Sequence, residues 1–188
     1  VVAAEALPLL LLKDLISVLP HVRFQAVYGM SEAVISCADQ DEMLARPGTA
    51  GRSFPRVELK IEDDELLVRG ALTVFKEYFD RPSPFRDGWF PTGDLVRRDD
   101  DGYLYVVDRK KDMVISGGYK VYSKELEQVL VQHPGIEDAA AVGVPDPTYG
   151  EAVVAVVQRR PGHEVREQDV VEHCRERLAG YKKPRHVL

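Results

Sequence analysis

Short apolar runs separated by turn residues fill the stretch between residues 48 and 108, and they constrain the fold more than any other feature. Residues 57–68 contain two alternating runs, typical of β-strands, on either side of Asp63-Asp64. Further along, Asp101-Gly102 separates two more apolar runs, which is a strong local signal for a β-hairpin. The stretch therefore predicts a β-rich subdomain, a layer or barrel-like arrangement of short strands.

The preceding residues, 1–47, predict the tail of a large α/β sheet subdomain. We expect residues 1–4 to end a buried strand, residues 8–19 to form a helix, and residues 23–28 to form a second strand. That strand leads into a turn at 29–32. Ligands gather at the carboxyl ends of strands in open α/β sheets, so this turn is a candidate site for chemistry.

The remaining residues, 109–188, predict a small, mobile α+β domain that begins after a dense run of charges at 108–112. Its predicted elements are a helix capped by Ser123 and ended at 133–135, strands at 139–144 and 152–158, and a second helix stopped by Gly180. The predicted fold class is thus mixed: α/β, then β-rich, then α+β.

Composition excludes some classes of function. The formal net charge of the 188 residues is -6 and no basic stripe appears, which argues against a nucleic-acid partner. The most apolar stretch, residues 7–19, is interrupted by Lys13 and Asp14 and is too short to span a bilayer. Cys37 and Cys174 match no metal or redox spacing, so we expect reduced thiols in a cytoplasmic protein.

Three segments combine residue types that suit a nucleotide. Residues 28–32 (YGMSE) offer an aromatic ring, a hydroxyl and a carboxylate. Residues 88–94 place a glycine directly before Asp94, whose carboxylate can accept hydrogen bonds from both hydroxyls of a ribose. Residues 102–119 carry Arg109 and a glycine pair. Taken singly, each segment is explained more simply as a turn or a solvated charge cluster.

In this order and spacing, the segments resemble the adenylate-forming superfamily, which includes acyl-CoA synthetases, luciferases and the adenylation domains of peptide synthetases. The matching stretches are YGMSE at 28–32, WFPTGD at 89–94, GYLYVVDRKKDMVISGGYKVYSKELE at 102–127, and VGVPDPTYGEAVVAVV at 142–157 leading to LAGYKKP at 178–184. The resemblance covers essentially the whole chain and is strongest to acyl-CoA synthetases.

The resemblance implies a role for each matching residue. Nucleotide contacts are implied for Tyr28 (adenine stacking), Gly29, Ser31 (phosphate), Asp94 (ribose) and Arg109 (sugar). A Mg²⁺ contact is implied for Glu32, a hinge for Lys111, and a tunnel for the pantetheine arm of coenzyme A at Gly117 and Gly118. The implied co-substrates are ATP and coenzyme A, with Mg²⁺.

Departures from the family pattern matter equally. The family's glycine-rich phosphate loop lies upstream of Tyr28, and its catalytic lysine lies past Leu188, so no catalytic residue is expected within these 188 residues. Lys182 and Lys183 are not that lysine; we expect them to be cations near the end of a helix. Two loops, at 62–65 and 81–84, are shorter than in the family.

The implied activity is that of an acyl-CoA synthetase, which joins a fatty or other carboxylic acid to ATP and then passes the acyl group to coenzyme A. The 188 residues alone are expected to be inactive. Two alternatives are an adenylation domain that loads a carrier protein and a non-catalytic nucleotide-binding module. The sequence does not identify the acid or the oligomeric state.

Overall fold

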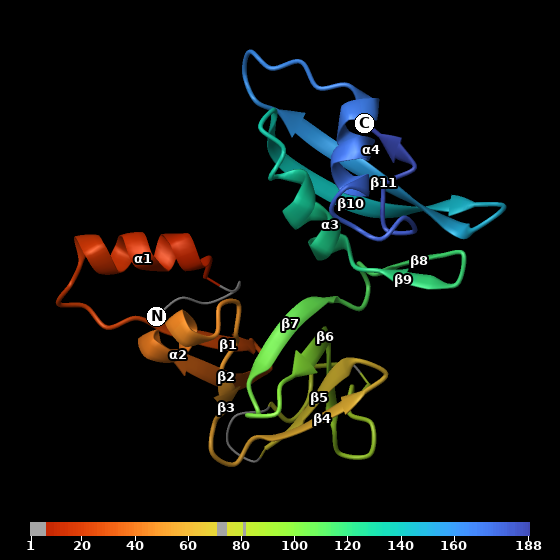
Figure 1. Cartoon of the computed structure of the whole chain (residues 1–188). Coiled ribbons are helices and arrows are strands. Elements are labelled where there is room, and N and C mark those ends of the chain that lie inside the picture. Colours follow the sequence, from red (N-terminus) through yellow and green to blue (C-terminus); the bar gives the residue numbers. More distant parts are fainter. Residues whose placement is uncertain (1–6, 71–74, 81) are drawn as a thin grey trace. The chain divides into compact units, whose positions relative to one another are not determined.

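The computed structural model describes residues 7–70, 75–80 and 82–188, and the chain divides into two compact units, Val1–Val106 and Val107–Leu188 (Figure 1). Both units are mixtures of helices and antiparallel sheets. The predicted strand at residues 1–4 lies outside the described residues. The further predicted division at residue 47 stays a prediction.

The described residues of the first unit form two helices and two small antiparallel sheets. Its elements are α1 (Leu9–Val18), β1 (Gln25–Met30), β2 (Ala33–Asp39), α2 (Gln40–Ala45), β3 (Arg52–Ser53), β4 (Glu58–Glu62), β5 (Glu65–Arg69), β6 (Phe90–Arg98) and β7 (Leu104–Arg109), which runs across the boundary into the second unit. The sheet orders are β1-β2-β3 and β4-β5-β6-β7.

The two predicted hairpins are present. Asp63 and Asp64 adopt positive φ angles of 51° and 69°, and Glu62 pairs with Glu65 across them. Positive φ at both central residues matches the right-handed twist of the flanking strands. The prediction of a barrel is not confirmed, because the described strands β4 to β7 form an open four-stranded sheet.

Helices α1 and α2 both differ from the sequence prediction. Pro8 is the N-cap residue of α1 rather than part of its first turn, and its carbonyl accepts from the Leu12 N–H at 2.9 Å. Helix α2 was not predicted, although Asp39 and Glu42 form a capping box in which each side chain accepts from the other residue's backbone N–H.

The second unit packs helices α3 and α4 on a sheet that is mostly antiparallel. Its elements are β8 (Val114–Ser116), β9 (Tyr119–Val121), α3 (Ser123–Leu130), β10 (Ile136–Asp146), β11 (Gly150–Arg159), α4 (Glu167–Arg175) and β12 (His186–Val187). The sheet order is β10-β11-β8-β9, and β12 pairs with β11 in parallel.

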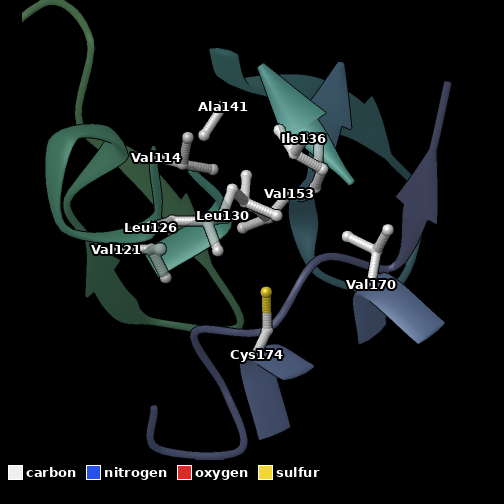
Figure 2. Packing of buried hydrophobic residues seen from close by; sticks show 10 residues of the cluster. Val114, Val121, Leu126, Leu130, Ile136, Ala141, Val153, Val170 and Cys174 are labelled. Carbon is white, nitrogen blue, oxygen red and sulfur yellow. The ribbon is translucent and has the colours of Figure 1, made fainter. Parts of the chain in front are cut away.

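The core of this unit gathers around Leu130. Figure 2 shows side chains from α3, α4 and the sheet pointing toward one another, among them Leu126, Leu130, Val153 and Cys174, all nearly inaccessible to solvent. Burial raises the pKa of the Cys174 thiol to about 11, so this cysteine acts as a small apolar core residue. Both cysteines are free, as the sequence predicted.

The ends of these helices differ from the prediction. Tyr122 is the N-cap of α3, and Ser123 is its first helical residue, whose hydroxyl donates to the Asp112 carbonyl at 2.6 Å instead of capping the helix. Helix α3 ends at Leu130, just before the predicted stop at 133–135. Helix α4 ends at Arg175, so Gly180 is not its terminator.

Candidate functional site

The YGMSE segment forms the turn between β1 and β2. The pairing of these strands shifts register between Tyr28 and Gly29, a bulge that places the Ser31-Glu32 turn at the end of the hairpin. A Cβ atom on Gly29 would lie 2.6 Å from the Ala33 carbonyl oxygen, so only glycine fits the close approach of the two strands. The Ser31 residue is exposed, and Glu32 is half-buried.

Two residues from separate sequence motifs meet in the first unit. The Tyr28 hydroxyl, on β1, donates to Oδ2 of Asp94, on β6, at 2.5 Å across 66 residues of sequence. Asp94 is only 2% exposed. The Thr92 hydroxyl fixes this part of β6, since it accepts from the Asp94 N–H at 3.1 Å and donates to the Leu66 carbonyl at 2.8 Å. The structure thus brings together the predicted adenine and ribose contacts.

A residue that the sequence reading missed contacts Glu32. The Tyr78 hydroxyl donates to Oε1 of Glu32 at 2.7 Å, across 46 residues of sequence. The Phe75 N–H donates to the Glu32 carbonyl oxygen, also at 2.7 Å. No local sequence pattern predicts this contact, because Glu32 and Tyr78 are 46 residues apart in the sequence.

Glu32 is suited to one particular mode of metal binding. Within residues 7–70, 75–80 and 82–188, no three His, Cys, Asp or Glu side chains gather as an all-protein metal site. Mg²⁺, however, is commonly bound by one or two carboxylates together with substrate phosphates and water. A single half-buried carboxylate beside an exposed serine turn is compatible with that arrangement.

The predicted residues of the second unit lie on its exposed turns. Arg109 ends β7 and is exposed, and Lys111 lies in the following turn. Gly117 and Gly118 form the turn between β8 and β9, with positive φ angles of 58° and 83°. The Gly117 N–H donates to the Tyr149 carbonyl at 2.9 Å, and a Cβ on Gly117 would lie 3.2 Å from the Tyr149 ring. This turn therefore packs closely against the β10–β11 hairpin.

Asp108, just before the predicted hinge, was also missed by the sequence reading. It is 6% exposed, and burial is the main cause that raises its pKa, against hydrogen bonds from the backbone of Arg109, Ser123 and Lys124 that act in the opposite direction. The Arg109 N–H donates to Oδ1 at 2.8 Å. Asp108 therefore joins the end of β7 to the first turn of α3.

Lys182 forms an ion pair, and the prediction that it lies near the end of a helix was wrong. Its ammonium donates to both carboxylate oxygens of Glu125, at 2.7 and 2.6 Å, rather than lying at the end of a helix. The adjacent Tyr181 stacks on Tyr119 with ring centroids 4.7 Å apart. These contacts tie the 178–184 segment to α3 and β9.

Comparisons with known proteins find relatives that are named as CoA ligases. Residues 125–188 match the model of the AMP-binding enzyme C-terminal domain. The chain is 40% identical, over its whole length and 38% of the relative's, to 3-[(3aS,4S,7aS)-7a-methyl-1,5-dioxo-octahydro-1H-inden-4-yl]propanoyl:CoA ligase of Rhodococcus jostii. It is also 40% identical to long-chain-fatty-acid–CoA ligase FadD13 of Mycobacterium tuberculosis, over 79% of this chain and 32% of the relative.

Solved structures of other proteins are also similar to this chain over nearly its whole length. O-succinylbenzoate coenzyme A synthetase (MenE) from Bacillus subtilis, in complex with ATP and magnesium ion, matches 99% of this chain and 41% of that chain with a TM-score of 0.85 and 33% identity. ATP-bound MatB from Rhodopseudomonas palustris matches 99% of this chain and 40% of its own length, with a TM-score of 0.86 and 32% identity.

The chain spans about two fifths of the length of these relatives. No helix among the described residues is long and apolar enough to cross a bilayer. The sequence motifs, the family model and the similarity to CoA ligases along this chain agree, and the chain belongs to the adenylate-forming superfamily.

Proposed function

We propose that the protein is an ATP-dependent, AMP-forming acid–CoA ligase. The observation that carries this proposal is the meeting of Tyr28 and Asp94, from two distant family motifs, in a chain similar throughout to CoA ligases. In the first step, a carboxylate oxygen of the acid attacks the α-phosphorus of ATP and pyrophosphate leaves. In the second, the coenzyme A thiolate attacks the acyl carbon and AMP leaves, so one difficult transfer becomes two easier ones.

The first unit supplies the proposed nucleotide contacts. The Tyr28 ring stacks on adenine, the Ser31 hydroxyl meets phosphate, and the Asp94 carboxylate binds the ribose hydroxyls. Because Asp94 is covered and bonded to Tyr28, ribose binding requires the tyrosine hydroxyl to release it. Glu32 holds Mg²⁺, which offsets the negative charge of the phosphates.

The second unit supplies the proposed moving part. Arg109 contacts the sugar, and Lys111 is the pivot about which residues 109–188 turn between the two half-reactions. The exposed turn at Gly117-Gly118 borders the path of the pantetheine arm. The finer subdomain division, at residues 47 and 108, and a cytoplasmic location are parts of the same proposal.

Coenzyme A is the proposed acceptor because three of the relatives described above are named as CoA ligases or a CoA synthetase. Those relatives act on different acids, so the acid is proposed only as a small-molecule carboxylic acid, fatty or other. A carrier protein bearing a pantetheine arm is the second candidate acceptor, since the superfamily includes domains that load such carriers.

An activity screen of the full-length protein tests this proposal. Acids of graded chain length and ring content are offered with MgATP and either coenzyme A or a pantetheinylated carrier protein. We expect acid-dependent release of pyrophosphate and AMP, with a thioester formed on free coenzyme A. Thioester on the carrier alone would support the second acceptor, and ADP with inorganic phosphate would contradict an AMP-forming ligase.

A further inference from the structure

We propose that Tyr78 is a positioning residue that orients the Glu32 carboxylate toward a divalent cation bound with the nucleotide phosphates. This inference rests on the proposed role of Glu32. It adds a residue that none of the matching sequence motifs contains.

The contact fixes the carboxylate itself. A phenol has one proton to donate, and Tyr78 gives it to Oε1 of Glu32 at 2.7 Å. A hydrogen bond to one named oxygen restricts rotation of the carboxylate about its terminal torsion, which is otherwise broad. The oxygen on the other side, Oε2, then keeps a constant direction. Partners of this kind, behind a ligand, set its orientation for the metal.

A second contact fixes the backbone of the same residue. The Phe75 N–H donates to the Glu32 carbonyl at 2.7 Å, so one short segment holds both the main chain and the side chain of Glu32. The Phe75 ring lies 4.7 Å from the Tyr78 ring and 5.1 Å from Phe90. Phe90 is 5% exposed and belongs to the core of the first unit. Glu32 is thus braced against the core although it lies on a turn.

Orientation matters here because Glu32 belongs to no group of three or more potential metal ligands among the described residues. A cation held by one carboxylate and by phosphates depends on that carboxylate's direction more than one held in a cage of many ligands. A purely structural hydrogen bond would instead leave cation affinity unchanged.

Tyr78→Phe tests the inference because it keeps the ring that packs on Phe75 and removes only the hydroxyl. In the full-length enzyme with a non-hydrolysable ATP analogue, we expect Mn²⁺ to bind roughly tenfold more weakly, measured by electron paramagnetic resonance of free Mn²⁺. The Mg²⁺ concentration that half-activates pyrophosphate exchange should rise by a similar factor. Phe79→Leu, at a neighbouring ring that is 98% exposed, is the matched control and should change neither value.

Glu32→Gln and the double variant separate the possible failures. If Tyr78 acts through Glu32, Tyr78→Phe should add no further loss of Mn²⁺ affinity once Glu32 is glutamine. Weaker Mn²⁺ binding in Glu32→Gln with unchanged binding in Tyr78→Phe would overturn the positioning role alone. Unchanged binding in Glu32→Gln would overturn the metal role of Glu32 and this inference with it. Melting curves without nucleotide establish that each variant is folded.

Discussion

In the full-length enzyme, Lys111→Pro should affect the two half-reactions unequally, and this is the largest effect we expect from a single substitution. A hinge residue absorbs a large change in φ and ψ when one domain turns against another. Proline holds φ near −65°, so it would trap one arrangement of the domains. Acid-dependent pyrophosphate exchange measures the first half-reaction, and thioester release from pre-formed acyl-adenylate measures the second. We expect a loss of roughly 100-fold in one activity, the cost of a misplacement of about 1 Å at a reacting centre, with the other activity retained.

Lys111 lies where a substitution disturbs no core packing. Its side chain is exposed in the turn after β7, and Lys111 belongs to none of the three core clusters of the described residues. Lys111→Ala is the matched control: it removes the charge but leaves φ free, and both half-reactions should stay near wild type. Circular dichroism and a melting curve exclude unfolding. Equal loss of both activities in a folded proline variant would contradict the hinge role.

Asp94→Ala should weaken ATP binding and lower turnover. A hydrogen bond between a hydroxyl and a charged group contributes roughly 1.5–3 kcal/mol, so a loss of about ten- to a hundredfold is expected. The affinity for the non-hydrolysable ATP analogue is measured by isothermal titration calorimetry, and the rate is measured by pyrophosphate exchange. Unchanged affinity and rate would mean that Asp94 does not bind the ribose.

Because Asp94 is buried and accepts from Tyr28, its removal also leaves the tyrosine hydroxyl without that partner. Tyr28→Phe controls for this contact, since it keeps the ring for adenine and removes only the hydroxyl. We expect Tyr28→Phe to retain ATP affinity within a few-fold, because the carboxylate is then released for the ribose. If Tyr28→Phe and Asp94→Ala lose affinity equally, the internal hydrogen bond, and not a ribose contact, explains both losses.

The hairpins were the most predictable part of the fold, because their signals are local. Asp63-Asp64 and Asp101-Gly102 combine turn residues with alternating strands, and both hairpins form where expected. The buried face of α3 also follows a local pattern, since Leu126 and Leu130 are four residues apart, lie on one helical face and are buried. Helix α2 was missed, although Asp39 and Glu42 have the spacing of a capping box.

Contacts between distant residues were not predictable in the same way. The sequence motifs named Tyr28, Glu32 and Asp94, but no pattern pairs residue 28 with 94 or residue 32 with 78. The start of α3 shows the same limit. Ser123 looks like an N-cap, yet Asp108 reaches its first turn from β7 and the serine bonds to a carbonyl instead.

Oxygen transfer from the acid to AMP tests the central claim most directly. The full-length enzyme is incubated with a substrate acid labelled with ¹⁸O in its carboxylate, together with MgATP and coenzyme A, and the AMP is analysed by mass spectrometry. If the carboxylate attacks the α-phosphorus, one ¹⁸O atom must appear in the AMP phosphate, because the thiolate displaces AMP with that oxygen attached. AMP without ¹⁸O, formed together with thioester, would contradict an acyl-adenylate intermediate and the account built on it.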